Sequence, residues 1–132
     1  MEHEEFEKKL MEMLLKGQDP VLGGLRKQYS DSLIESSRFT GAGFFTHFKV
    51  KTGTTPVAGG KTFQIGDMHA SFNDIKVAFG FILFIEKGYL SFLEGYTLSS
   101  DVWPDDYSDV ILSYDGPNGK RDFEKLKQNW SK

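Results

Sequence analysis

Residues 80–98, with the sequence GFILFIEKGYLSFLEGYTL, carry the strongest structural signal in the chain. Residues 80–86 are apolar on both alternating faces, which predicts a central strand covered on each side. Lys87 and Gly88 form a turn signal, and residues 89–98 predict the returning strand. We therefore expect a sheet built around this β-hairpin.

Shorter strands are predicted on both sides of the hairpin, because apolar and polar residues alternate there. Residues 33–39 can pair with residues 43–51 through a turn that contains Gly41 and Gly43, and residues 52–60 predict a loop. The remaining predicted strands are residues 63–65, 68–72 and 109–114.

Helical spacing is confined to the two ends of the chain. An apolar stripe at i, i+4, i+7 and i+8 predicts a first helix, and Asp19 followed by Pro20 marks the start of a second. The stripe consists of Phe6, Leu10, Met13 and Leu14, and helical spacing returns at Phe123, Leu126 and Trp130. This order predicts an α+β fold for residues 1–132, a single domain with a curved antiparallel sheet of five to six strands, N-terminal helices and a C-terminal helix.

The composition is that of a folded domain with little metal or redox chemistry. Charged residues make up 27% and apolar residues 39% of 132 residues, which excludes a disordered, collagen-like or coiled-coil chain. The absence of cysteine excludes disulfides, thiolate zinc sites and iron–sulfur clusters. Ten of the twelve phenylalanines fall between residues 39 and 92, where they favour sheet packing over a ligand cage. We expect no cofactor.

Charge is segregated along the chain although the net charge is only −3. Residues 36–66 contain no acid, and residues 88–119 contain no lysine or arginine. Such segregation favours a protein partner or self-association, unless the two segments pair with each other inside the fold. The net charge gives no attraction to nucleic acid or to an anionic membrane. The basic residues are Arg38, Lys49, Lys51 and Lys61, and the acidic ones are Glu94, Asp101, Asp105, Asp106, Asp109 and Asp115.

The cell compartment is predicted from two stretches. Residues 1–10 are rich in acids and lack the apolar core of a secretory signal. Residues 77–85, the longest run without charge or strong polarity, have fewer than half of the about twenty residues that span a membrane. We expect a cytoplasmic protein.

Glu94 is the main candidate for chemistry, with Tyr96 beside it on the same predicted face. Alternation from Leu90 to Leu98 places Glu94 on an otherwise apolar stripe, where an unpaired carboxylate is costly. One hypothesis is a small ligand-binding protein or hydrolase centred on Glu94 with His47 or His69. The alternative is structural: a bulge at Gly95 turns Glu94 outward, or Glu94 binds backbone amides or Arg38. We favour the structural alternative, because no second catalytic candidate is tied to Glu94 by spacing.

A metal site is conceivable on the polar faces of two predicted strands. His47 and His69 could meet across the sheet if their strands were neighbours, with Asp67 nearby, and such a set can hold zinc or iron. Lys49 and Lys51 would repel the cation. We therefore expect solvated histidines and no metal.

The segment Trp103–Pro104–Asp105–Asp106–Tyr107 predicts a rigid, aromatic and acidic loop. Exposed Trp and Tyr side chains are common anchors of protein contacts, so this loop is a candidate partner-binding site. The alternative is that Trp103 folds back as a lid over the end of the sheet.

Three motifs together resemble a group of small uncharacterised bacterial proteins. They are residues 37–46 (SRFTGAGFFT), residues 93–97 (LEGYT) and the pair Trp103–Pro104. The resemblance implies a bacterial α+β domain of unknown function and adds no catalytic residue. The LEGY strand also resembles those of some toxin-immunity proteins, and the acidic segment would suit a basic toxin. Taken together, the sequence favours a non-enzymatic binding or interaction module, with a dimer as one form.

Overall fold

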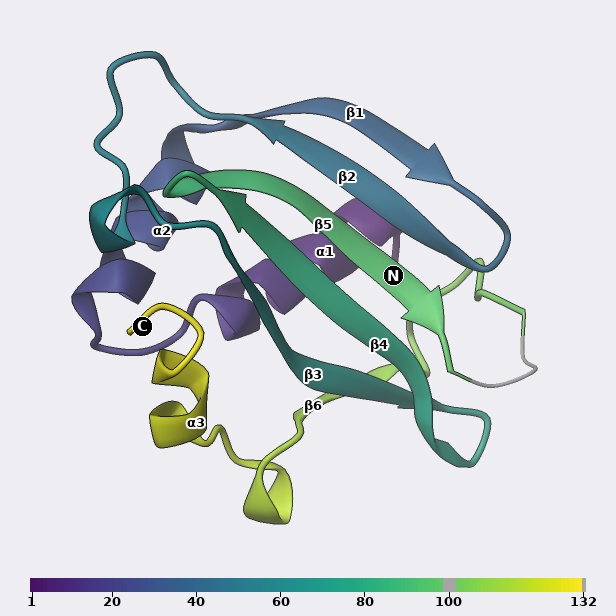
Figure 1. Ribbon diagram of the computed structural model, residues 1–132. Helices are drawn as coiled ribbons and strands as arrows, with labels where there is room; N and C mark the ends of the chain where they lie inside the picture. The colour runs from purple at the N-terminus through teal and green to yellow at the C-terminus, as the bar shows by residue number, and fades with distance from the viewer. Residues whose placement is uncertain (99–101, 132) are drawn as a thin grey trace.

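The computed structural model describes residues 1–98 and 102–131 (Figure 1). Its strands form one open antiparallel sheet in the order β1-β2-β5-β4-β3-β6. The predicted α+β class, with a six-stranded antiparallel sheet, is confirmed. The strands are β1 (Leu33–Phe39), β2 (Gly43–Lys49), β3 (Phe63–Phe72), β4 (Ile75–Glu86), β5 (Tyr89–Thr97) and β6 (Ile111–Tyr114).

The β4–β5 hairpin forms as the sequence predicts. Lys87 and Gly88 connect the strands with φ angles of 52° and 81°, the positive values that the tightest hairpin turns require. The β1–β2 hairpin is also confirmed. Residues 63–65 and 68–72, which were expected to form two strands, belong to the single strand β3, which has a register shift between Ile65 and Met68. A local irregularity of this kind bends a strand without ending it.

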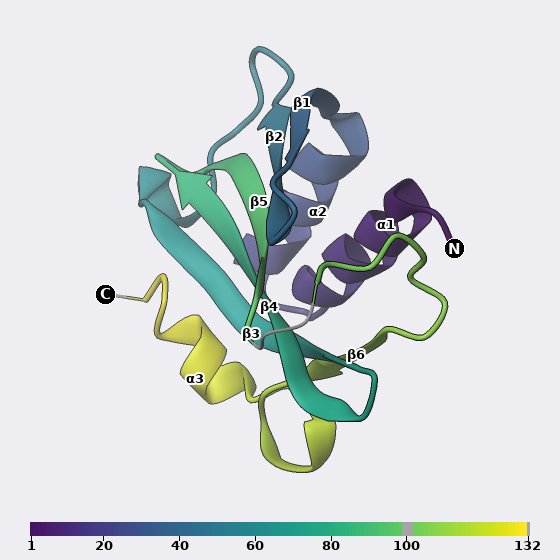
Figure 2. The same cartoon turned by 90° about the vertical axis from the view of Figure 1, so that its right-hand side faces the viewer.

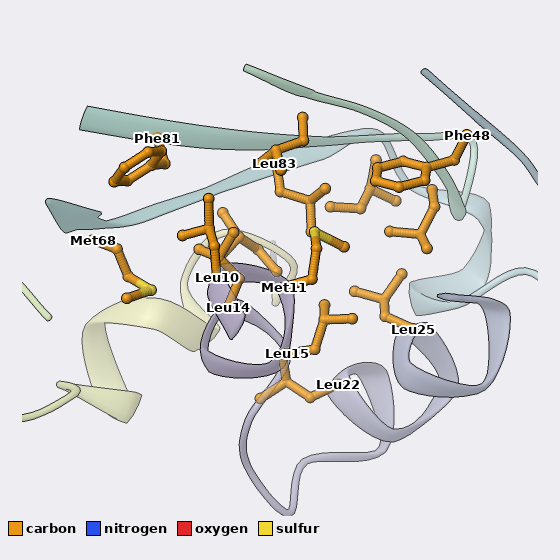
Figure 3. Packing of buried hydrophobic residues seen from close by; sticks show 14 of the residues in the cluster. Leu10, Met11, Leu14, Leu15, Leu22, Leu25, Phe48, Met68, Phe81 and Leu83 are labelled. Carbon is orange, nitrogen blue, oxygen red and sulfur yellow. The ribbon is translucent and has the colours of Figure 1, made fainter. Parts of the chain in front are cut away.

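Two helices cover one face of the sheet, α1 (His3–Leu14) and α2 (Pro20–Asp31), as Figure 2 shows. The α1 stripe packs on the inner side of β3 and β4, and α2 packs at the β5 end of the same face. Gln28 of α2 is buried and holds the hairpin turn, since it donates to the Gly88 carbonyl at 3.0 Å and accepts from the Leu90 amide at 2.9 Å. Figure 3 shows part of this core, including Leu10, Met11, Leu14, Leu22, Leu25, Phe81 and Leu83.

The opposite face of β2, β5 and β4 has no helix or strand over it within the described residues, and we call it the uncovered face (Figure 2). The prediction that β4 is covered on each side was therefore wrong. Phe81 and Leu83 are buried beneath the helices, whereas Ile82 and Phe84 are only half-buried on the uncovered face. The β4 strand is apolar on both faces although only one of them is covered.

The third helix, α3 (Phe123–Lys127), lies beside β3 (Figure 2), and its first residue, Phe123, is close to Gly17 in the connection between α1 and α2. A short 3-10 turn, η1 (Ala58–Gly60), precedes β3, and another, η2 (Pro117–Gly119), precedes α3. Trp130, just beyond α3, packs against Phe63 with ring centroids 5.4 Å apart. The C-terminal segment thus covers the first half of the β3 edge, while β6 pairs with the second half, from Met68 to Ser71.

Candidate functional site

Trp103 and Tyr107, which were predicted as exposed anchors, are both buried. The Trp103 ring packs against Phe44 and Phe79, with centroids 5.5 Å and 4.6 Å away. The structure therefore follows the alternative in which Trp103 folds back over the end of the sheet. Gly95 leaves room for it, because a Cβ atom there would lie 3.0 Å from the indole ring.

The acids of this segment remain on the surface. Asp105, Asp106 and Asp109 are exposed. Asp106 accepts hydrogen bonds from the Met1 amino group at 2.9 Å and from the Ser108 side chain at 2.7 Å, and these bonds lower its pKa to about 2. Asp101, counted with the acidic segment, lies outside the described residues. Among the described residues, no ion pair joins the basic segment to the acidic one.

A chain of hydrogen bonds fixes the Trp103 segment to α1 and β2. The Trp103 indole N–H donates to the Tyr107 hydroxyl at 2.8 Å, and that hydroxyl lies 2.9 Å from Nδ1 of His3. Nε2 of His3 lies 2.8 Å from Oε2 of Glu7, which also accepts from the buried Thr46 hydroxyl at 3.0 Å. Glu7 is only 4% exposed. These contacts explain how a carboxylate is tolerated in the core.

One arrangement of protons satisfies every group in this chain. The Tyr107 hydroxyl accepts from Trp103, so its own proton can be donated to Nδ1 of His3, and Nε2 of His3 can then donate to the Glu7 carboxylate. His3 and Glu7 were not among the predicted site residues. The available signal was their spacing with Leu10 and Leu14, which puts all four on one helix face. Trp103, Tyr107, Glu7 and Thr46 are all buried, and their hydrogen bonds hold the Trp103 segment against α1 and β2.

The uncovered face carries an aromatic cluster formed by Phe45, His47, Phe84 and Phe92. Phe92 lies at its centre, stacked on Phe84 at 4.2 Å and on His47 at 5.1 Å between ring centroids. Phe45 is 6.4 Å from Phe92. Three adjacent strands, β2, β5 and β4, supply the four side chains. The cluster is half-buried by its own contacts, except for the exposed His47.

Glu94 and Tyr96 share this face with Phe92, but Leu90 does not. The register of β5 shifts between Phe92 and Leu90, so that Ser91 is an extra residue and Leu90 turns into the core. The predicted stripe from Leu90 to Leu98 is therefore broken by a bulge at Ser91 and not at Gly95. Glu94 lies between Phe45 and Ile82 of the neighbouring strands, half-buried.

Tyr96 lies over Gly80, where a Cβ atom would be 2.7 Å from the phenol ring. Partial burial raises the pKa of Tyr96, and the carboxylates of Glu94 and Asp115 raise it further. A groove of about 580 Å³ extends from Tyr96 to α3. Gln64, Ile82, Lys125 and Asn129 are among its lining residues. The aromatic cluster and this groove are adjacent parts of one surface.

The histidines predicted as weak metal ligands do not come together. His47 is on β2 and His69 on β3, and the strands β5 and β4 lie between them. His69 binds Asp115, with Nδ1 2.6 Å from Oδ1, and Asp67 is paired with Arg121. No group of three metal-ligating side chains occurs in residues 1–98 and 102–131. The condition for a site formed by His47, His69 and Asp67 is not met.

None of the helices in the described residues has the length and apolar character needed to cross a bilayer. A comparison of the chain with protein-family models, curated proteins and solved structures found no match.

Proposed function

We propose that the chain is a non-enzymatic protein-interaction module whose partner contacts the uncovered face of the sheet. The observation that carries this proposal is the aromatic cluster around Phe92 on a sheet face without a covering layer. Aromatic side chains are enriched in protein interfaces, and contiguous apolar surface marks interaction sites. Burial of Trp103 and Tyr107 moves the expected contact surface from the acidic loop to this face.

Polar groups surround the aromatic cluster in the way that interfaces require. Arg38 pairs with Phe45 across β1 and β2, and Lys49 ends β2 on the same face. Glu94 borders the cluster on β5. A partner that packs on Phe92 can therefore meet charged groups of both signs at the rim, where they set orientation and specificity.

The enzymatic alternative, centred on Glu94 with His47 or His69, has less support. His47 pairs with Phe92, two residues from Glu94, so it can reach Glu94 only along the diagonal between the two strands. His69 lies opposite Gly80, with β4 between it and β5. Within the described residues, no hydrogen bond or ion pair orients the Glu94 carboxylate. An acid or base without an orienting partner is a weak catalyst.

Selection of binding peptides tests the interaction function. A phage-displayed library of random linear peptides is selected on the immobilised chain, and the affinity of the selected peptides is measured for variants. Phe92→Ser should weaken binding by about tenfold or more, as truncation of a central aromatic anchor does. Ile111→Ser removes an exposed apolar residue from β6, the opposite edge of the sheet, and should leave the peptide affinity unchanged. Failure to select any peptide, or equal binding to Phe92→Ser, would overturn the proposal.

A second copy of the chain is one candidate partner for the same face. Sedimentation velocity over a range of concentrations measures this directly. Self-association through the aromatic cluster should disappear in Phe92→Ser and persist in Ile111→Ser. If a dimer persists in Phe92→Ser, the uncovered face is not the contact between copies.

A further inference from the structure

Resting on the proposed interaction function, we propose that the partner adds an extended strand to the outer edge of β1, and that this strand alternates apolar and acidic residues. The β1 strand ends the sheet, and all seven of its residues are exposed. Leu33, Ile34 and Phe39 are 71%, 56% and 57% exposed. A long edge strand with exposed apolar side chains is a template for pairing with another chain.

The backbone of β1 presents its free groups at two defined residues. The Thr40 N–H donates to the Gly43 carbonyl at 3.0 Å, so the Thr40–Gly43 pair is hydrogen-bonded across the hairpin. Hydrogen-bonded pairs alternate along an antiparallel ladder, so Arg38 and Ser36 also bond inward to β2. Ser37 and Phe39 therefore direct their N–H and C=O groups outward, away from β2. An added strand would bond to these two residues.

The side chains of β1 define the chemistry of the added strand. Arg38 is opposite Phe45 on the uncovered face, and a residue paired with Arg38 would lie beside its guanidinium. Phe39 is opposite Phe44 on the helix side, 4.8 Å from the His3 ring. Among the described residues, neither Arg38 nor Lys49 forms an ion pair. An acidic residue opposite Arg38, flanked by apolar residues opposite Ser37 and Phe39, complements this edge.

A second copy of β1 fits this edge poorly, which favours a different protein as the partner. Two-fold antiparallel pairing centred on Arg38 would place the two Arg38 side chains directly opposite each other, and like charges in that position repel. Pairing centred on Ser37 would place Phe39 opposite Glu35 of the other copy, where β1 has its register shift. Neither register brings the exposed apolar residues together. Pairing centred on Phe39 would join only residues 37–41, at the end of β1, and would leave Leu33 and Ile34 without a partner.

The first experiment blocks the edge without disturbing the hairpin. Ser37→Pro removes the outward N–H, and the inward bonds of Arg38 and Ser36 remain. We expect Ser37→Pro to lower the affinity for the library-selected peptides by about tenfold or more, whereas Ser37→Ala should bind them with the affinity of the wild-type chain. In the wild-type chain, peptide binding should slow hydrogen exchange of the Ser37 and Phe39 amides, whereas the Arg38 amide is already protected without peptide.

The second experiment reverses the charge of Arg38, which is exposed on the edge strand. Peptides selected on the wild-type chain should be rich in acidic residues. Their affinity for Arg38→Glu should be lower by about tenfold or more. Selection repeated on Arg38→Glu should then yield basic residues at the same place. Peptides with no acidic preference, or with equal affinity for Arg38→Glu, would overturn the complementarity.

The variants separate this inference from the function on which it rests. Loss of binding in Phe92→Ser together with normal binding and unchanged amide exchange in Ser37→Pro would overturn strand addition and leave the proposed function in place. Loss in Ser37→Pro with normal binding to Phe92→Ser would support strand addition and overturn the role of the uncovered face. Loss in both variants supports a partner that lies across β1 and the aromatic cluster.

Discussion

Trp103 and Tyr107 are joined by a buried hydrogen bond of 2.8 Å from the indole N–H to the hydroxyl. The same hydroxyl lies 2.9 Å from the imidazole of His3, more than a hundred positions away in the sequence. One oxygen atom therefore connects the segment after β5 to α1, and through Glu7 to Thr46 of β2. Because of this connection, Trp103 and Tyr107 belong to the core, although their sequence suggests an exposed loop.

Removal of that oxygen is the direct test of the connection. Tyr107→Phe should lower the free energy of unfolding by about 1–3 kcal/mol, because it leaves the Trp103 N–H buried without an acceptor and His3 without its donor. Urea denaturation measures the change. Tyr29→Phe is the control, since Tyr29 is half-buried and its hydroxyl makes no hydrogen bond among the described residues. Equal stability of the two variants would show that the connection contributes nothing.

Alkaline pH should destabilise the fold through its tyrosines. Burial is the largest cause that raises the pKa of Tyr29, Tyr96, Tyr107 and Tyr114. Because the folded-state pKa lies above the unfolded value of about 10, the stabilising contribution is complete below that pH and is lost as the pH rises through the folded pKa. The free energy of unfolding should therefore fall above about pH 10.

An optical measurement separates the ionisation of the tyrosines from that of all other groups. Ultraviolet absorbance of the phenolate should appear at higher pH in the folded chain than in the chain denatured by urea. Coincident titration curves would contradict the assignment to tyrosine.

The hairpins were predictable because their signals are local. Lys87 and Gly88 specify a turn, and the apolar residues around them specify strands, whatever the rest of the chain does. The side of the sheet on which Leu90 lies was not predictable from alternation, because one extra residue, Ser91, moves it to the opposite face. The alternation of apolar and polar residues does not reveal a bulge of a single residue.

The candidate site was predictable only in part, because its contacts are long-range. Glu94 and Tyr96 do lie on a common face, as alternation suggested. The burial of Trp103 depends on the space left by Gly95 and on the Tyr107 hydroxyl, and neither is visible as a local pattern. Likewise, the separation of His47 from His69 follows from the strand order, which depends on the connections of the whole sheet.

A methyl group at Gly95 should disrupt the packing of Trp103. The added Cβ of Gly95→Ala would lie 3.0 Å from the indole ring and closer still to the Phe44 ring, so that both rings must move. Overpacking of this kind costs about 1–3 kcal/mol of stability. Gly66→Ala is the matched control in β3, since its Cβ would meet no atom closer than 3.4 Å. Thermal or urea unfolding of the pair checks the prediction, and equal losses would refute it.

Arg121 holds the C-terminal segment to the end of α1 through a side chain that is only 3% exposed. Its guanidinium binds both oxygens of Asp67, at 2.8 Å and 3.0 Å, and it also donates to the carbonyls of Met13, Leu14 and Lys16. The carbonyls of Leu14 and Lys16 lie at and just beyond the C-terminal end of α1, where the helix provides no further N–H donors, whereas the Met13 carbonyl also accepts from the Lys16 N–H and the Tyr114 hydroxyl. Arg121 thus satisfies the helix end and the Asp67 carboxylate at once.

Replacement of Arg121 by methionine should therefore cost more than the loss of a surface charge. Arg121→Met keeps the volume of the side chain but leaves Asp67 without its counter-ion, and we expect a loss of about 3 kcal/mol in the free energy of unfolding. Lys120→Met removes an exposed positive charge from the adjacent position and should be nearly neutral. The double variant Asp67→Asn with Arg121→Met should recover part of the loss, because the uncompensated charge is gone. An Arg121→Met chain as stable as Lys120→Met would show that the other contacts of the C-terminal segment, such as those of Trp130, are enough to hold it.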